Sequence, residues 1–184
     1  MNRSSKPATA VAVASALLAV GVGVGVFGLQ ASSAGAATQL VAQEATAIPS
    51  SLAVPPGNRL AETMTVLRGS QVYTCTTGAW TLLEPVSVLR AGHAYVLNTR
   101  GPAWTSVNDG SSVTGMAVAS VPVPYAAPEL LVKAVSNAGS GWLGNVDFIQ
   151  RLDTVGGAAP TGACANGAMD AVRYQAEYRF WVPD

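Results

Sequence analysis

Apolar and polar residues alternate in the last segment of the chain. One set of alternating positions is apolar: Val172, Tyr174, Ala176, Tyr178, Phe180 and Val182. The positions between them are mostly polar or charged: Arg173, Gln175, Glu177, Arg179 and Trp181. A period of two places successive side chains on opposite faces of a strand. The segment therefore predicts a long strand with one face buried in a sheet.

A second apolar stretch, residues 146–155, contains the polar pair Gln150 and Arg151. A turn of the form Gly156-Gly157-x-x-Pro160 follows, and Cys164 comes soon after it. This pattern predicts a core strand with a sharp exit. A buried guanidinium needs a carboxylate or several carbonyl groups as partners. We therefore expect Arg151 to be a structural residue, held by several carbonyl groups or by an acid near in sequence or on an adjacent strand: Asp147, Asp153 or Glu177.

The segments between residues 59 and 121 are short runs of β-branched and aromatic residues, separated by glycine, proline and asparagine. They predict strands at residues 64–68, 71–75, 79–83, 94–98, 102–107 and 112–119. Turns are expected at Gly69-Ser70, at Thr77-Gly78 and at residues 108–111. Residues 129–137 have features of both a short helix and a buried strand, and we favour the strand. With no convincing amphipathic helix, the chain predicts an all-β fold, a single-domain antiparallel β-sandwich or barrel-like domain.

The N-terminus predicts an export signal. Arg3 and Lys6 precede an uncharged apolar run over residues 8–29, and Ala34-x-Ala36 supplies small residues for cleavage. We expect residues 1–36 to be a signal peptide, residues 37–47 a flexible linker and residues 48–184 the β-domain of a secreted, extracellular protein. The alternative is an uncleaved membrane anchor, because an apolar run of this length can span a bilayer. In that case the membrane contact is made through this segment alone.

Composition excludes several functions. Only 11% of the residues are charged, with 10 Lys and Arg against 10 Asp and Glu. No basic cluster is available to bind phosphates, so we expect no nucleic-acid partner. The glycine pattern Gly23-x-Gly25-x-x-Gly28 resembles a dinucleotide fingerprint, but it lies inside the predicted signal peptide and lacks the strand and helix that such a site needs. We therefore expect no nucleotide cofactor, and no other cofactor.

Two cysteines in an exported chain predict a Cys75–Cys164 disulfide. His93 is the one histidine of the chain, and no Cys-x-x-Cys motif accompanies it. A metal site needs several such ligands, so none is expected.

Several short motifs occur in a characteristic order. They are Gly69-x-Gln71-Val72-Tyr73-x-Cys75, Trp80, Gly101-Pro102-x-Trp104, Asp109-Gly110-Ser111-x-Val113-x-Gly115, Ile149-Gln150-Arg151-Leu152-x-Thr154-x-Gly156-Gly157-x-x-Pro160, Cys164 and Tyr174-x-Ala176-x-Tyr178-x-Phe180. This series resembles the family known as domain of unknown function 3455, over about residues 48–182. The resemblance implies a secreted protein of bacteria or fungi with no established activity. In the family pattern a histidine stands three residues before the glycine of Gly-Pro-x-Trp, whereas this chain has Asn98 there.

The candidate binding residues are the polar and aromatic residues of these motifs, which we expect to converge: Asn98, Trp104, Asp109 and Arg151. Trp142 and Trp181 are expected to be exposed and available for stacking on a ligand. The candidate catalytic groups are carboxylates, which could act in pairs on a glycan: Asp109, Asp153 and Glu177. No nucleophile with a neighbouring base is evident.

Two function classes follow. The first, which we favour, is a non-catalytic domain that binds an extracellular or cell-wall ligand or has a structural role at the cell surface. The second is a carboxylate-dependent hydrolase or lyase that acts on an extracellular polymer.

Overall fold

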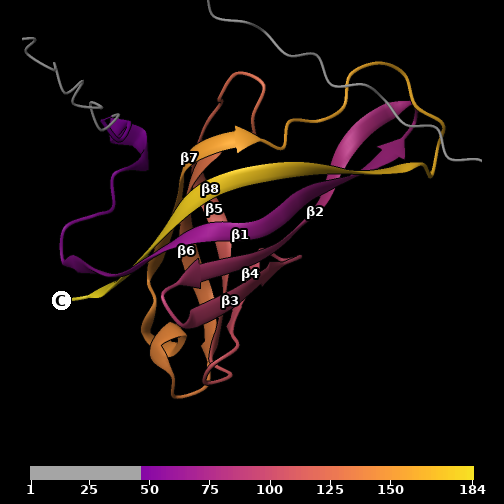
Figure 1. Cartoon of the computed structure of the whole chain (residues 1–184). Helices are drawn as coiled ribbons and strands as arrows, with labels where there is room; N and C mark the ends of the chain where they lie inside the picture. The colour runs from indigo at the N-terminus through magenta and orange to yellow at the C-terminus, as the bar shows by residue number, and fades with distance from the viewer. Residues whose placement is uncertain (1–46) are drawn as a thin grey trace, which may run out of the picture. The chain divides into compact units, whose positions relative to one another are not determined.

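The computed structural model describes residues 47–184, which fold into eight antiparallel strands (Figure 1). The predicted signal peptide and the linker up to residue 46 lie outside the described residues. The strands are β1 (Asn58–Thr76), β2 (Ala79–Ala91), β3 (Ala94–Thr99), β4 (Ala103–Ser106), β5 (Ser112–Val121), β6 (Glu129–Ala138), β7 (Phe148–Gly156) and β8 (Met169–Pro183). The helical segments of this part of the chain are two short 3-10 turns, η1 (Ser50–Leu52) and η2 (Trp142–Asn145).

The strands close into a barrel. Each strand pairs with the next one in the chain, and β8 returns to pair with β1. Closure leaves no edge strand with unpaired backbone groups. The all-β prediction is confirmed, and the barrel is the alternative that the chain adopts. The ambiguous residues 129–137 form β6, a strand as favoured from the sequence.

The barrel core follows from the alternation in β8. Its apolar positions Tyr174, Ala176, Tyr178, Phe180 and Val182 are all buried, whereas the intervening side chains are exposed or half-buried. They pack inside the barrel against residues from every other strand: Met64, Val66, Leu89, Val96, Trp104, Val113, Val132 and Ile149. The period of two predicted this burial correctly.

Strand β7 is buried on both faces, which explains why its sequence is not alternating. Ile149 faces the barrel core, and Phe148 and Leu152 face outward. The outer pair is covered by Leu52 of η1, so the N-terminal segment forms a second, smaller apolar cluster outside the barrel. A continuous apolar run is typical of strands in parallel sheets, which are covered on both faces. Here β7 has such a run because the N-terminal segment covers its outer face.

The turn η2 closes one end of the barrel. Leu143 is buried in the core, and the Trp142 ring packs edge-to-face on Phe180 with ring centroids 5.1 Å apart. Trp142 is therefore half-buried and not exposed as expected. Trp181 is also half-buried, because its indole N–H donates to Gln150 Oε1 at 2.9 Å. Trp142 nevertheless lines a cavity of about 420 Å³ at the surface, together with Arg59 and Asn145.

The predicted turn at Gly69-Ser70 is wrong, because β1 continues through both residues. Gly69 does not have the positive φ of a hairpin turn, and a Cβ there would lie 2.8 Å from the Ser87 Cβ and from the Tyr174 ring. The glycine therefore permits a close approach between strands. The register of β1 against β8 shifts between Thr65 and Ser70, so this stretch is an irregularity within one long strand.

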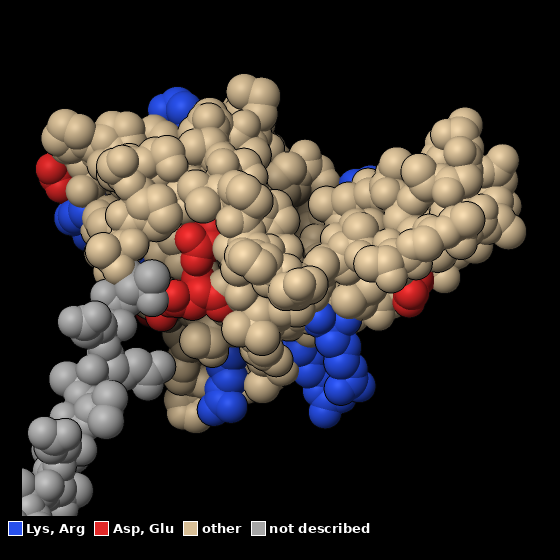
Figure 2. Space-filling model, turned by 90° about the horizontal axis from the view of Figure 1, so that it is seen from above, with Lys and Arg blue, Asp and Glu red and all other residues tan. Residues whose placement is uncertain are grey.

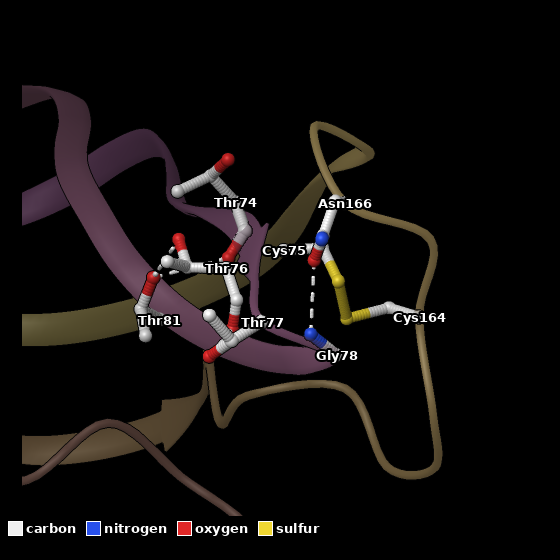
Figure 3. Close-up of a disulfide and its surroundings, with 8 residues drawn as sticks. All are labelled: Thr74, Cys75, Thr76, Thr77, Gly78, Thr81, Cys164 and Asn166. Carbon is white, nitrogen blue, oxygen red and sulfur yellow. Dashed lines mark hydrogen bonds between the residues drawn. A yellow bond between two sulfur atoms is a disulfide. The ribbon is translucent and has the colours of Figure 1, made fainter.

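The hairpin of β1 and β2 projects from the barrel with the start of β8 (Figure 1). Its turn is the predicted Thr77-Gly78, whose φ angles of 52° and 79° suit a two-residue hairpin. The loop between β7 and β8 crosses this arm and is joined to it by the predicted Cys75–Cys164 disulfide, with a Cα–Cα distance of 5.9 Å (Figure 3). Asn166 Oδ1 accepts a hydrogen bond from the Gly78 N–H at 3.0 Å beside it. The disulfide prediction is confirmed.

Candidate functional site

Polar side chains gather inside the barrel, at the end opposite η2. Asn98, Trp104, Arg151 and Tyr178 line an inner cavity of about 30 Å³, whose remaining wall is Leu130, Val132, Ile149, Pro85 and Pro102. The four polar or aromatic residues are each 6% exposed or less. Such polar groups are rare in a barrel interior, which is usually filled by apolar side chains, so this cavity is the candidate site.

Strand register places these residues. Asn98 of β3 pairs with Trp104 of β4, and Arg151 of β7 pairs with Tyr178 of β8. Side chains at directly paired positions lie on the same face of a sheet. Both pairs point inward, and closure of the barrel brings them to one cavity. Three of the four predicted binding residues are therefore brought together.

Arg151 has no acidic partner in this cavity. Its Nε and Nη2 groups donate to the Pro128 carbonyl oxygen at 3.0 and 2.8 Å. Among residues 47–184 no carboxylate oxygen lies within the 4.0 Å of a salt bridge to Arg151. The structure excludes the three acids considered as partners, Asp147, Asp153 and Glu177, and the other alternative, a carbonyl partner, is the one that Arg151 has.

The three acids lie elsewhere for geometric reasons. Asp147 precedes β7 and pairs with Lys133 at 3.2 Å. Glu177 is on the outer face of β8, where it pairs with Arg179 at 2.6 Å. Asp153 shares the alternation of Arg151, but it has a positive φ of 50° at a break in the β7–β8 register and is exposed. Arg151 is thus a buried cation with a neutral partner.

Two tyrosines extend the polar lining. The Tyr178 hydroxyl lies 3.1 Å from the Tyr174 hydroxyl, which donates to Ser87 Oγ at 2.9 Å. Asn98 Nδ2 donates to the Tyr178 hydroxyl at 3.4 Å. Burial, and then the neighbouring Tyr174, raise the pKa of Tyr178 well above its usual range, against the lowering effect of Arg151. The Tyr178 phenol therefore stays protonated, and it donates to the Tyr174 oxygen, because the Tyr174 proton goes to Ser87.

Several buried polar atoms near this cavity have no partner within the described residues. They include Trp104 Nε1, Asn98 Oδ1 and Gln71 Nε2. A buried polar atom without a hydrogen bond costs about 1–3 kcal/mol, and folded proteins contain few of them. Trp104 and Asn98 line the inner cavity and Gln71 lines the wider cavity next to it, so this region of the barrel can receive polar groups.

A wider outer cavity adjoins the inner one. It has a volume of about 400 Å³ and is lined by Gln71, Leu82, Leu83, Glu84, Pro85, Arg100, Gly101, Pro102, Ala117, Leu130 and Arg151. The two cavities share the side chains of Pro85, Pro102, Leu130 and Arg151. Figure 2, which views the molecule from above, shows a hollow between the barrel body and the projecting arm, on a surface with few charges. A ligand could enter from this outer cavity and reach Arg151.

Asp109 does not join the other three predicted binding residues. It lies in the turn between β4 and β5, where its carboxylate accepts from the Ser111 N–H at 2.9 Å, from Ser111 Oγ at 2.6 Å and from the Trp142 N–H at 3.3 Å. The hydrogen bonds from Ser111 lower the pKa of Asp109 to about 2. Any side chain larger than hydrogen at Gly141 would overlap this carboxylate. Asp109 therefore anchors η2 across the closed end of the barrel.

The remaining candidate catalytic acids lie on the outer surface. Asp153 borders a small cavity of about 60 Å³ beside η1, together with Glu129 and Arg179. The Asp153 N–H donates to Glu129 Oε1 at 2.8 Å, and Glu177 is held by Arg179. The barrel wall separates these groups from the inner cavity. The arrangement does not bring Asp109, Asp153 and Glu177 to a common cleft.

His93 is exposed in the turn between β2 and β3, where its carbonyl oxygen accepts from the Asn108 side chain. Within residues 47–184 no group of three or more His, Cys, Asp or Glu side chains is arranged to hold a metal ion. In the same part of the chain, no helix is both long and apolar enough to cross a membrane.

Sequence reasoning missed Gln71 and Tyr178. Tyr178 was assigned to the apolar face of β8, which is correct, but its hydroxyl makes that face polar at the level of Arg151. Gln71 is 1% exposed, and the sequence placed it at the start of a strand, next to a turn that does not exist. Both residues belong to the motifs of the family resemblance, which was the available signal.

Comparison with known families agrees with this resemblance. The family model described as "Protein of unknown function (DUF3455)" matches residues 83–182. The chain belongs to the DUF3455 family. The matched range contains every residue that lines the inner cavity of this DUF3455 protein, and Cys164 of the disulfide, whereas Gln71 and Cys75 precede it. No curated protein and no solved structure matches the chain.

Proposed function

We propose that this chain is a secreted, non-catalytic binding protein whose barrel holds a small extracellular ligand. The observation that carries the proposal is the inner cavity with its buried, unpaired polar atoms, next to a wider outer cavity. Small-molecule sites are concave and mostly apolar, with a few convergent polar groups. Eight-stranded barrels are wide enough to hold one small ligand at this position.

The arrangement of acids favours binding over catalysis. A glycoside hydrolase or lyase needs two carboxylates that face each other across a substrate cleft. The nearest structural equivalents here lie on the outer surface, where Asp153 is exposed and Glu177 is held by Arg179. The inner cavity has no carboxylate in its lining. These observations support the non-catalytic alternative.

A blocking substitution tests the proposal. Leu130 lines both cavities, so Leu130→Trp should fill the passage between them. Leu97 of β3 is 42% exposed, so Leu97→Trp is a matched control. A library of small neutral and charged compounds is screened by thermal shift against the wild type and both variants. We expect compounds that stabilise the wild type and Leu97→Trp but not Leu130→Trp.

Two other results would contradict binding inside the barrel. Compounds that stabilise Leu130→Trp as well as the wild type would place the ligand outside the barrel. A library without any stabilising compound, together with turnover of an extracellular polymer by the same protein, would favour the enzyme. The export part of the proposal is tested separately, by N-terminal sequencing of protein from the culture supernatant, which should begin close to Ala37.

A further inference from the structure

We propose that the ligand is a small monocarboxylate, with its carboxylate bound to Arg151 in the inner cavity and its apolar part in the outer cavity. This inference rests on the proposed function and names the class of ligand for the same site. It follows from three features of the barrel interior: an unneutralised cation, a set of unpaired donors and the sizes of the two cavities.

The first feature is the charge of Arg151. Its side chain is 6% exposed, and an arginine remains charged throughout the pH range of folded proteins. A buried charge is stabilised by an opposite charge, and a single carbonyl oxygen supplies only part of that. The two hydrogen bonds to Pro128 use Nε and Nη2, which leaves the Nη1 edge of the guanidinium for another partner. The planar guanidinium matches the geometry of a carboxylate.

The second feature is the excess of donors. The indole N–H of Trp104 has no partner. Gln71 Nε2 is also unpaired, at the wall of the outer cavity. One unpaired acceptor, Asn98 Oδ1, is also present, while Asn98 Nδ2 already donates to the Tyr178 hydroxyl. A cation and unpaired N–H donors in two adjoining cavities complement an anion that only accepts hydrogen bonds.

The third feature is size. The inner cavity of about 30 Å³ has room for about two water-sized groups, which corresponds to the two oxygens of a carboxylate. The outer cavity of about 400 Å³ is bordered by apolar side chains, including Leu82, Leu83 and Leu130, and it can hold a hydrocarbon body. At its rim Arg100 and Glu84 lie 3.6 Å apart and neutralise each other. The site therefore offers one unneutralised charge, at its inner end.

Two matched pairs of probes test this inference: benzoate with benzamide, and hexanoate with hexanamide. Each amide has nearly the shape of its acid but no charge. Binding is measured by calorimetry at about pH 7, where a carboxylic acid is ionised. We expect each carboxylate to bind at least about tenfold more tightly than its amide, as a charge-assisted hydrogen bond predicts. Inorganic phosphate and sulfate, which are larger anions without an apolar part, should bind weakly or not at all.

Variants assign the preference to Arg151. Arg151→Gln removes the charge and retains hydrogen-bonding groups, so the carboxylate should lose its advantage while the amide binds as before. Arg151→Lys, which keeps the charge without the planar fork, should retain part of the advantage. Arg90→Gln is the control, because Arg90 is exposed and lines neither cavity, and it should bind like the wild type. If Arg151→Gln does not fold, the comparison of acid with amide in the wild type decides.

The results separate this inference from the proposed function. Equal binding of acid and amide, both blocked by Leu130→Trp, would overturn the carboxylate assignment and leave the binding function intact. Phosphate that binds as tightly as the carboxylates would also overturn it, in favour of a general anion site. Failure of every probe and every library compound would overturn both.

Discussion

Gln150 and Arg151 are neighbours in the chain and lie on opposite faces of β7. Gln150 points outward, where its amide donates to the Leu52 carbonyl at 2.7 Å and accepts from the Trp181 indole at 2.9 Å. Arg151 points inward and lines both cavities. One polar residue therefore attaches the N-terminal segment to the barrel, and the next supplies the charge of the candidate site. Separate substitutions should separate stability from binding.

Gln150→Ala should destabilise the fold. The substitution leaves the Leu52 carbonyl and the Trp181 N–H without their partner and opens a space under η1. We expect a loss of about 2–4 kcal/mol in the free energy of unfolding, measured by urea denaturation. The control is Gln175→Ala on the exposed face of β8, which should change stability by less than about 0.5 kcal/mol. A Gln150→Ala variant as stable as the control would contradict the role assigned to this amide.

Arg151→Met, unlike Gln150→Ala, should not lower the stability of the fold. The methionine keeps much of the length of the side chain and removes a buried charge that has no acidic partner among the described residues. Replacing a poorly compensated buried charge by an apolar group is often neutral or stabilising. We expect the ligand-free variant to unfold at the same temperature as the wild type or at a higher one.

Exposed Arg68→Met is the control for a general effect of removing an arginine. A loss of more than about 2 kcal/mol in Arg151→Met alone, without any ligand, would show that Arg151 is a structural residue of the barrel. Binding sites commonly keep such unfavourable groups because function requires them. A stable Arg151→Met variant that no longer distinguishes acids from amides would therefore show that Arg151 serves ligand binding and not the stability of the fold.

The sequence predicted the fold better than the site, for reasons that particular residues make plain. The alternation in β8 indicates burial directly, because successive side chains of a strand lie on opposite faces of the sheet. Gly69 was misassigned because a glycine in a hairpin turn and a glycine beneath a distant ring look alike in sequence. The ring belongs to Tyr174, which is far along the chain and contacts Gly69 only after β8 has closed the barrel.

The partner of Arg151 shows the same limit. Asp153 has the right alternation to share a face with Arg151, but the positive φ at Asp153 turns its side chain to the surface. Asn98 and Trp104 could be grouped with Arg151 only through shared family motifs, because their meeting depends on closure of the barrel. Asp109 was grouped with them wrongly, since its carboxylate accepts hydrogen bonds from the Ser111 N–H in the turn and from the Trp142 N–H of η2.

The Cys75–Cys164 disulfide should stabilise the arm and the loop between β7 and β8. The cysteines are 89 positions apart, and for a closed loop of that length the chain-entropy model gives about 4–5 kcal/mol as an upper value. Replacing both cysteines by serine should lower the melting temperature and expose residues 157–168 to limited proteolysis. The reduced wild type should behave like the double variant. Equal protease resistance in all three proteins would contradict a role for the disulfide in holding this loop.

The Asp109 carboxylate should make stability depend on pH in the acidic range. Its pKa in the folded state is lowered from 3.8 to about 2, chiefly by the hydrogen bonds from Ser111. A group with a lowered folded-state pKa stabilises the fold above its unfolded-state pKa. That contribution is lost as pH falls from about 4 to about 2, because the unfolded chain takes up its proton first.

Asp109→Asn isolates this contribution. The amide cannot ionise, so the variant should be less stable than the wild type at neutral pH, and the difference should shrink as pH approaches about 2. Asp170→Asn, at an exposed position on the arm, is the control and should track the wild type. Thermal melts across this range provide the measurement. A difference between Asp109→Asn and the wild type that stays constant with pH would show that the hydrogen bonds to Ser111 and Trp142 act without the charge.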